Sequence, residues 1–194
     1  MVTLVSGNMR CGSSLVMRML GAGGMPLCYT QPESFEHDRC LAVMAGGDLS
    51  WVREAEGKAL KWLDPLIHGG PPKSFDYRTI VLTRDATWQH RSQVHFLSML
   101  GHGVQETRAA RRMLAKDNGA LAGFWKKYGA VLSLTFEEII TQPHGSAVVI
   151  AAFLSDVPLD IDAMRAQVLD RPTRCTDAPW ELDVIPSASL WRPR

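Results

Sequence analysis

Residues 2–24 read VTLVSGNMRCGSSLVMRMLGAGG and combine three pieces in a set order. Residues 2–5 are apolar or β-branched and predict a buried strand. A loop with glycines at positions 7 and 12 follows, and residues 13–20 carry apolar side chains spaced as in a helix. Glycines let the backbone turn tightly, and a helix N-terminus is positively polarised. Strand, loop and helix together therefore predict an anion-binding cradle.

The glycine spacing of this loop, G-x-x-x-x-G from Gly7 to Gly12, is that of a nucleoside-triphosphate P-loop. Such a loop needs a lysine at position 13, but this chain has Ser13 there, and its cation is Arg10 inside the loop. Hydrolysis of a nucleoside triphosphate is not expected without that lysine. A loop that combines Arg10 with the hydroxyls of Ser13 and Ser14 still suits a sulfate or phosphate ester.

Further strands are predicted by the β-branched runs at residues 78–83 and 130–135, and a shorter one by residues 59–63. Helical spacing predicts helices between and after these strands. They cover residues 86–100, 104–127 with an interruption near 118–119, 145–154 and 160–169. This alternation predicts an α/β fold of the three-layer P-loop type. Its central parallel sheet is flanked by helices, with the first strand at the centre.

Three candidate ligand groups directly follow predicted strands: the loop, Arg84 and Thr135. The carboxyl ends of parallel strands lie along one edge of the sheet, where ligands of open α/β folds bind. We therefore expect the loop, Arg84 and Thr135 to lie at a common site.

Composition limits the function further. At 194 residues the chain is expected to form one domain over 1–194, with residues 171–194 as a Pro-rich, polar C-terminal tail. A net charge of +1 argues against a nucleic-acid partner. No apolar run approaches the ~20 residues that span a bilayer, so no membrane span is expected. The chain begins directly on the first strand with no signal peptide, which favours a cytoplasmic protein.

The four cysteines are Cys11, Cys28, Cys40 and Cys175, and no two of them form a C-x-x-C pair. This spacing predicts free thiols and no metal site. Cys11 lies at the predicted helix N-terminus, a position that lowers the pKa of a thiol, although the sequence offers no partner for a thiol nucleophile.

The stretch SGNMRCGSSLVMRMLGAGGMPL, residues 6–27, resembles the 5′-phosphosulfate loop of the sulfotransferase family. Bacterial members carry a similar S-G-x-P-R-S-G-T-S-L followed by a helix and A-G-G. The resemblance implies binding of 3′-phosphoadenosine 5′-phosphosulfate, the sulfonate donor of that family. Two positions depart from the pattern, because Met9 replaces a common proline and Cys11 a serine or threonine. The resemblance implies donor contacts from Gly7, Arg10, Cys11, Gly12, Ser13 and Ser14.

A second stretch, VLTRDATWQHRSQ at residues 81–93, resembles the family motif in which an arginine and a serine eight residues later bind the 3′-phosphate. Arg84 and Ser92 have that spacing. Taken without the resemblance, Arg84 also suits an ion pair with Asp85, and Ser92 a solvent-facing position. Weaker matches to the family cover nearly the whole chain. Residues 171–174 resemble the basic tail of the family, which implies Arg174 as a further donor ligand.

The resemblance implies transfer of a sulfonate group to a hydroxyl or amine of an acceptor that the sequence does not identify. Arg10 is expected to stabilise charge on the leaving phosphate. The general base is Glu36, which matches a family glutamate, or His37, whose ordinary pKa lies near neutrality. Lys61 at a strand end is either a ligand contact or a structural residue. No metal is expected, since no acidic pair suits Mg²⁺.

Two other functions remain open at this point. One is a P-loop kinase-like phosphotransferase, which the missing lysine argues against. The other is a non-catalytic nucleotide-binding protein, which the departures at Met9 and Cys11 leave possible. The oligomeric state cannot be read from the sequence.

Overall fold

The computed structural model describes residues 1–32, 34–42 and 48–169, with the backbone alone at 41 and 42. The predicted C-terminal tail, residues 171–194, and the predicted donor ligand Arg174 lie outside the described residues.

The described chain forms a five-stranded sheet in the order β2-β3-β1-β4-β5, with every neighbouring pair parallel. The strands are β1 (Val2–Gly7), β2 (Leu27–Cys28), β3 (Ala59–Leu63), β4 (Tyr77–Thr83) and β5 (Gly129–Thr135). The predicted parallel α/β fold is confirmed, and so is the central place of the first strand. All six residues of β1 are buried, as expected for a strand covered on both faces.

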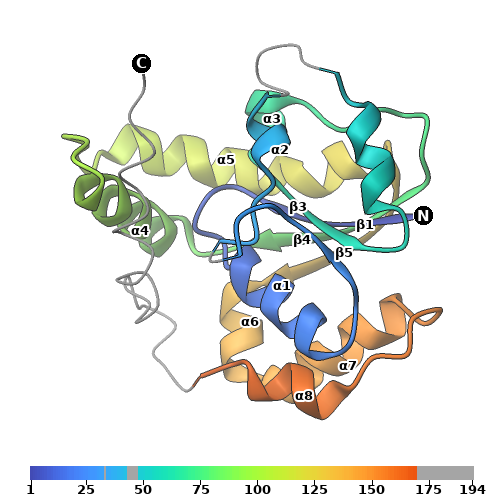
Figure 1. The fold of residues 1–194 in the computed structure, drawn as a ribbon. Helices are drawn as coiled ribbons and strands as arrows, with labels where there is room; N and C mark the ends of the chain where they lie inside the picture. Colours follow the sequence, from blue (N-terminus) through green and yellow to red (C-terminus); the bar gives the residue numbers. More distant parts are fainter. Residues whose placement is uncertain (33, 43–47, 170–194) are drawn as a thin grey trace.

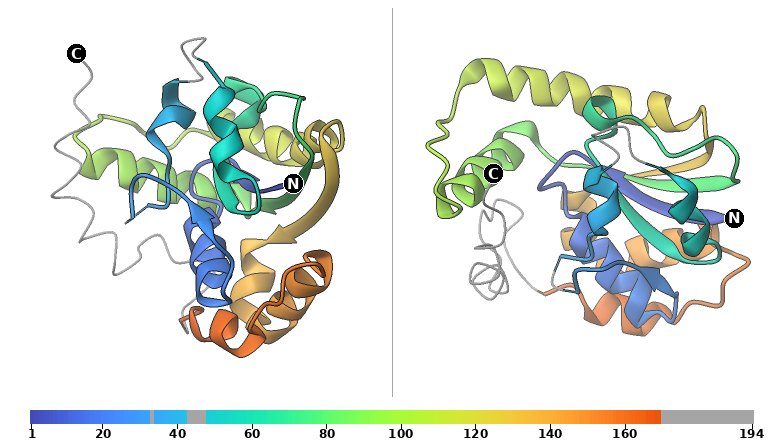
Figure 2. Two further views of the ribbon diagram at one scale, coloured as in Figure 1. Left: turned by 45° about the vertical axis from the view of Figure 1, so that its right-hand side comes forward. Right: turned by 45° about the horizontal axis from the view of Figure 1, so that its top comes forward.

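Helices cover both faces of this sheet (Figure 1). The right-hand view of Figure 2 shows the strands between α5 above and α1, α7 and α8 below. Neighbouring strand residues point to opposite faces of the sheet. Val5 therefore packs on the face covered by α1, and Leu4 packs on the face covered by α5. The helices are α1 (Ser13–Ala22), α2 (Asp38–Ala42), the 3₁₀ helix η2 (Ser50–Ala55), α3 (Pro65–His68), α4 (Ala86–Met99), α5 (Arg108–Trp125), α6 (Phe136–Thr141), α7 (Pro143–Phe153) and α8 (Ile161–Ala166).

Helix α4 lies at the end of the molecule opposite the N-terminus, beyond the carboxyl ends of the strands (Figure 1). This is the edge where the sequence predicts a ligand site. Within the described residues, no helix is both long enough and apolar enough to cross a membrane.

One local prediction was wrong, and one strand was not predicted. The predicted interruption near residues 118–119 is absent, because α5 is continuous from Arg108 to Trp125 and the Asn118 side chain is hydrogen-bonded to neighbouring elements. The connection over residues 25–39 contains the edge strand β2, which pairs with β3. Two residues are too few to show a strand period, so the sequence gives no signal for β2.

Candidate active site

The loop between β1 and α1 depends on its two glycines. Gly12 is the N-cap of α1 with φ of 98°, and a Cβ there would lie 2.7 Å from the Phe136 ring. A Cβ at Gly7 would collide with the carbonyl oxygen of Leu82. Since Gly12 has no side chain to cap α1, it leaves the first-turn N–H groups without a side-chain acceptor at that position. The loop therefore has the backbone geometry of an anion cradle.

Arg10 connects this loop to α4. Its Nε donates to Ser92 Oγ at 3.0 Å, and its guanidinium carbon lies 5.0 Å from the centroid of the Phe96 ring. Ser92 is completely buried, and Arg10 has a φ of 71°, which is uncommon outside glycine. The resemblance implies Ser92 and Arg84 as two ligands of one 3′-phosphate, and the structure adds a contact between Ser92 and Arg10. Two motifs separated by 82 residues thus meet at one place.

Arg84 packs against the first residue of α6. The residue is 7% exposed, and its guanidinium carbon lies 4.3 Å from the centroid of the Phe136 ring, a distance suited to a cation–π contact. Phe136 also packs against Gly12. Arg84 and the loop therefore share one aromatic neighbour at the carboxyl edge of the sheet, as the sequence predicted for strand-end residues.

Met9, one of the departures from the family pattern, has a structural role. Its N–H donates to Asp64 Oδ1 at 3.0 Å, a bond that proline could not make. Asp64 follows β3 with φ of 49°, and burial raises the pKa of its carboxyl group while the bond from Met9 opposes that shift. The β3 end thus supports the loop from the side opposite to α4.

Side-chain amides fix the loop from the α4 and α5 side. Gln89, which is completely buried, donates to the carbonyl oxygens of Asn8 and Met9 at 3.1 and 3.0 Å. Gln93 donates to the same Met9 oxygen at 2.9 Å. Asn118 on α5 accepts from Asn8 Nδ2 at 2.8 Å and donates to Gln89 Oε1 at 2.8 Å. Amide donors of α4 thus hold both loop carbonyls, and Asn118 of α5 bonds the Asn8 and Gln89 side chains, so both helices help to fix the loop.

Sequence reasoning missed this amide network. A readable signal was present, because Gln89 and Gln93 lie four residues apart and therefore share one face of a helix. The partner Asn118 gave no such signal, since Asn-Gly favours a helix break when taken alone.

Lys61 lies next to the first turn of α1. It is 4% exposed, and its Nζ donates to Ser14 Oγ at 3.0 Å, to the carbonyl of Ser34 at 2.8 Å and to Glu36 Oε1 at 3.0 Å. Ser14 Oγ in turn donates to the Ser34 carbonyl at 3.2 Å. The Ser14 hydroxyl thus donates its hydrogen bond to Ser34 in the connection after α1. The positive charge of Lys61 is paired with the carboxylate of Glu36.

The two candidate bases face different surroundings. Glu36 pairs with Lys61 beside the loop, and its side chain is 30% exposed. His37 is buried, and its ring stacks on Trp51 at a centroid distance of 4.3 Å. Burial and the nearby Arg39 lower the pKa of His37. Glu36 therefore combines solvent access with a place near the loop, whereas His37 packs into the aromatic cluster around Trp51.

The lowered pKa predicted for Cys11 was wrong. Its side chain is completely buried in the core under α1, and desolvation raises its pKa to about 11 despite opposing hydrogen bonds from Ser13. Its N–H donates to the Asn8 carbonyl at 3.2 Å. The thiol therefore lies in the core and not at the surface of the anion cradle. Cys11, Cys28 and Cys40 are free thiols, as predicted, while Cys175 lies outside the described residues.

Among the comparisons with known proteins, those with solved structures gave matches. No family model matches the sequence, and no curated protein matches it. Among solved structures, the chain is similar to a "Sulfotransferase Domain from the Curacin Biosynthetic Pathway" at 13% identity and a TM-score of 0.48. The alignment covers 93% of this chain and 81% of that one.

Proposed function

We propose that this protein is a sulfotransferase that moves a sulfonate group from 3′-phosphoadenosine 5′-phosphosulfate to a hydroxyl or amine of a small acceptor. The observation that carries the proposal is the 3.0 Å hydrogen bond between Arg10 Nε and Ser92 Oγ. It brings together the loop suited to a phosphosulfate and the strand-end motif suited to a 3′-phosphate. The direct test is transfer of labelled sulfonate from this donor to a panel of hydroxyl and amine acceptors.

The residues present fit such a donor. The glycine turn and the N-terminus of α1 suit the oxygens of a phosphosulfate, because both present N–H groups to an anion. Arg10 adds a permanent positive charge beside them. Arg84, held against Phe136, is the proposed ligand of the 3′-phosphate. The backbone N–H groups of Ser13 and Ser14 complete the proposed donor site.

Sulfonate transfer requires little covalent chemistry from the protein. The bond between sulfur and the phosphate oxygen breaks, a bond from the acceptor oxygen or nitrogen to sulfur forms, and the acceptor proton leaves to a base. Arg10 stabilises the negative charge that grows on the phosphate. Glu36 is the proposed base, and its Oε1 bond to Lys61 leaves Oε2 for the acceptor proton.

Replacing Glu36 by glutamine is expected to lower kcat by about 10²–10⁴-fold with little change in donor affinity, because the base acts on the acceptor. Steady-state kinetics and calorimetric titration of the product nucleotide measure the two quantities. Glu54→Gln, which removes an exposed carboxylate paired with Arg39, is the matched control. If His37→Ala lowers kcat while Glu36→Gln does not, the base is His37.

Replacing Arg84 by alanine is expected to weaken binding of adenosine 3′,5′-bisphosphate by about one to two powers of ten, since a charge-assisted contact contributes about 1.5–3 kcal/mol. Binding of adenosine 5′-phosphate, which lacks the 3′-phosphate, should barely change. Calorimetric titration compares both nucleotides, and Arg91→Ala is the control because Arg91 is exposed and paired with Glu106. An equal loss for both nucleotides would exclude Arg84 as the 3′-phosphate ligand.

A further inference from the structure

A basic hollow lies where α4 and α5 meet, and none of its lining residues belongs to the loop at residues 7–14. Its volume is about 270 Å³. It is lined by Ala86, Thr87, Arg108, Arg111, Arg112 and Ala115. Half of the lining is thus arginine, and Arg108 and Arg112 are exposed, so this is a shallow surface hollow in which like charges gather and repel one another.

The three arginines lie on one face of α5, at spacings of three and four residues, where like charges destabilise a helix. Over the described residues none of the three side chains has a hydrogen bond, an ion pair or a ring contact. The Nε of Arg111 is buried and also lacks a hydrogen-bond acceptor there. A buried donor without an acceptor is costly, so this group calls for a partner that the described residues do not supply.

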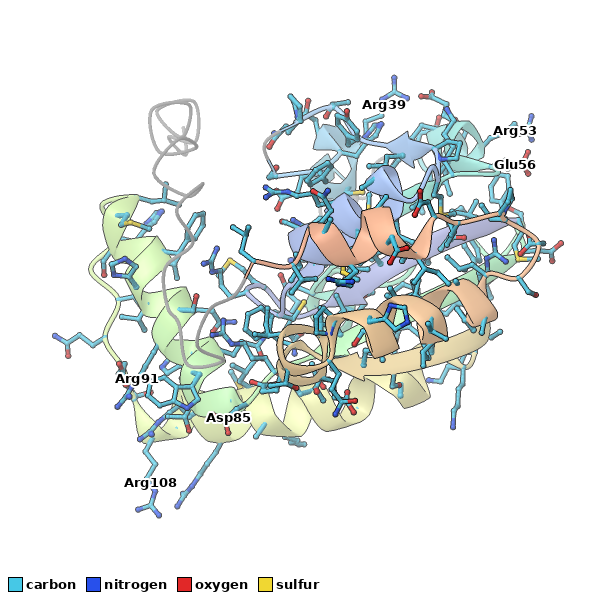
Figure 3. All side chains as sticks on the ribbon, turned by 90° about the horizontal axis from the view of Figure 1, so that it is seen from below. Arg39, Arg53, Glu56, Asp85, Arg91 and Arg108 are labelled. Atoms are coloured by element: carbon cyan, nitrogen blue, oxygen red, sulfur yellow. The ribbon has the colours of Figure 1, made fainter. Side chains whose placement is uncertain are left out.

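Two acidic side chains close to the starts of α4 and α5 have partners other than these arginines. Asp85 caps α4 by accepting from the N–H groups of Thr87 and Trp88 at 3.0 and 3.1 Å. Glu106 pairs with Arg91 at 3.3 Å. Figure 3 shows Arg91, Asp85 and Arg108 together at this end of the molecule, with Arg108 extending outward. Within the described residues, neither carboxylate forms an ion pair with an arginine of the hollow.

Helix polarity adds to this positive charge. The hollow touches the first turn of α4, and α5 starts beside it, since the Thr107 N–H donates to His90 Nε2 on α4 at 3.3 Å. Both helices thus turn their positive N-terminal ends toward this region. Arginines in the first two turns of a helix are unfavourable for the same reason, unless an anion lies between them.

We propose that this hollow binds a sulfate or phosphate group, as the free dianion or as a monoester on a larger molecule. Guanidinium groups match the tetrahedral oxyanion through paired N–H donors, and such charge-assisted bonds are among the strongest in proteins. A dianion offsets two of the three positive charges and gives Arg111 Nε an acceptor. This hollow shares no lining residue with the proposed nucleotide site, and the proposal does not depend on the proposed transfer reaction.

The test is a nuclear magnetic resonance titration of the labelled full chain with sodium sulfate, against sodium chloride at equal ionic strength. We expect saturable shifts at the Thr87 and Arg112 amides and at Arg111 Nε–H. R111Q/R112Q should raise the dissociation constant by about tenfold or more. The control R53Q/R165Q removes two charges elsewhere, with Arg53 on the opposite side from Arg108 in Figure 3, and should bind as the wild type does.

Sulfate binding at the loop of residues 7–14 is followed separately, through the shift of the Gly12 amide. Adenosine 3′,5′-bisphosphate should suppress sulfate shifts at Gly12 and leave those at Thr87, so the two sites succeed or fail independently. Phenyl phosphate identifies the source: equal affinity shows that the free ion suffices, and tighter binding indicates a monoester on a larger molecule. Shifts at Thr87 that never saturate, or an unchanged dissociation constant in R111Q/R112Q, would overturn the proposal.

Discussion

Replacing Arg10 by alanine should lower the rate of sulfonate transfer by about 10²–10³-fold, the usual effect of removing one preorganised group that stabilises transition-state charge. The affinity for adenosine 3′,5′-bisphosphate should fall much less. The reason is that the charge on the bridging oxygen grows only as the leaving group departs, so Arg10 acts mainly on the transition state. Single-turnover kinetics and calorimetric titration of the product nucleotide measure the two effects.

Arg10→Lys is the matched variant, because it keeps the charge but loses the Nε–H that Ser92 Oγ accepts. It should retain part of the activity that Arg10→Ala loses. Equal losses of rate and nucleotide affinity in Arg10→Ala would assign Arg10 to uniform binding instead of catalysis. An unchanged rate would remove Arg10 from the mechanism.

Replacing Gln89 by leucine should destabilise the fold by roughly 2–4 kcal/mol, since it removes three hydrogen bonds of a completely buried side chain and each contributes about 0.5–1.5 kcal/mol. The substitution leaves the carbonyls of Asn8 and Met9 without this donor, and Asn118 Nδ2 without this acceptor. Urea denaturation measures the loss. Nucleotide affinity should fall as well, because these bonds hold the loop that carries Arg10.

Gln105→Leu is the control, as it changes an exposed glutamine and should leave the unfolding midpoint near that of the wild type. Gln89→Glu keeps an acceptor for Asn118 but removes both donors to the loop. It should be destabilised like Gln89→Leu if the loop bonds matter most. A wild-type unfolding midpoint in Gln89→Leu would show that the amide network does not stabilise the loop.

The sheet was predictable because its central strands are continuous β-branched runs with helical segments between them. Residues 78–83 are such a run, and they form β4 with only Tyr77 added. The loop was predictable for a similar reason, since Gly7 and Gly12 satisfy steric demands that only glycine meets at those positions. Strand propensity is local, and the glycines can be read from residue type alone, although the groups that crowd Gly7 and Gly12 are Leu82 and Phe136, which are distant in sequence.

The contacts that complete the site depend on distant residues. Spacing alone could not show that Ser92 contacts Arg10, because that contact depends on how α4 packs over the loop. The pKa of Cys11 was predicted with the wrong sign because helix polarity is local, whereas the desolvation that raises it comes from the assembled core. The roles of Met9 and Asp64 were hidden for the same reason.

The central claim is that this site binds a nucleotide carrying both a 5′-phosphosulfate and a 3′-phosphate. Calorimetric titration of the wild-type protein with adenosine 3′,5′-bisphosphate, adenosine 5′-phosphate and ATP with Mg²⁺ tests it most directly. We predict that the bisphosphate binds at least about tenfold more tightly than adenosine 5′-phosphate, because only the bisphosphate reaches Arg84. It should also bind more tightly than ATP with Mg²⁺. Equal affinity for the two adenosine nucleotides, or tighter binding of ATP with Mg²⁺, would contradict the account.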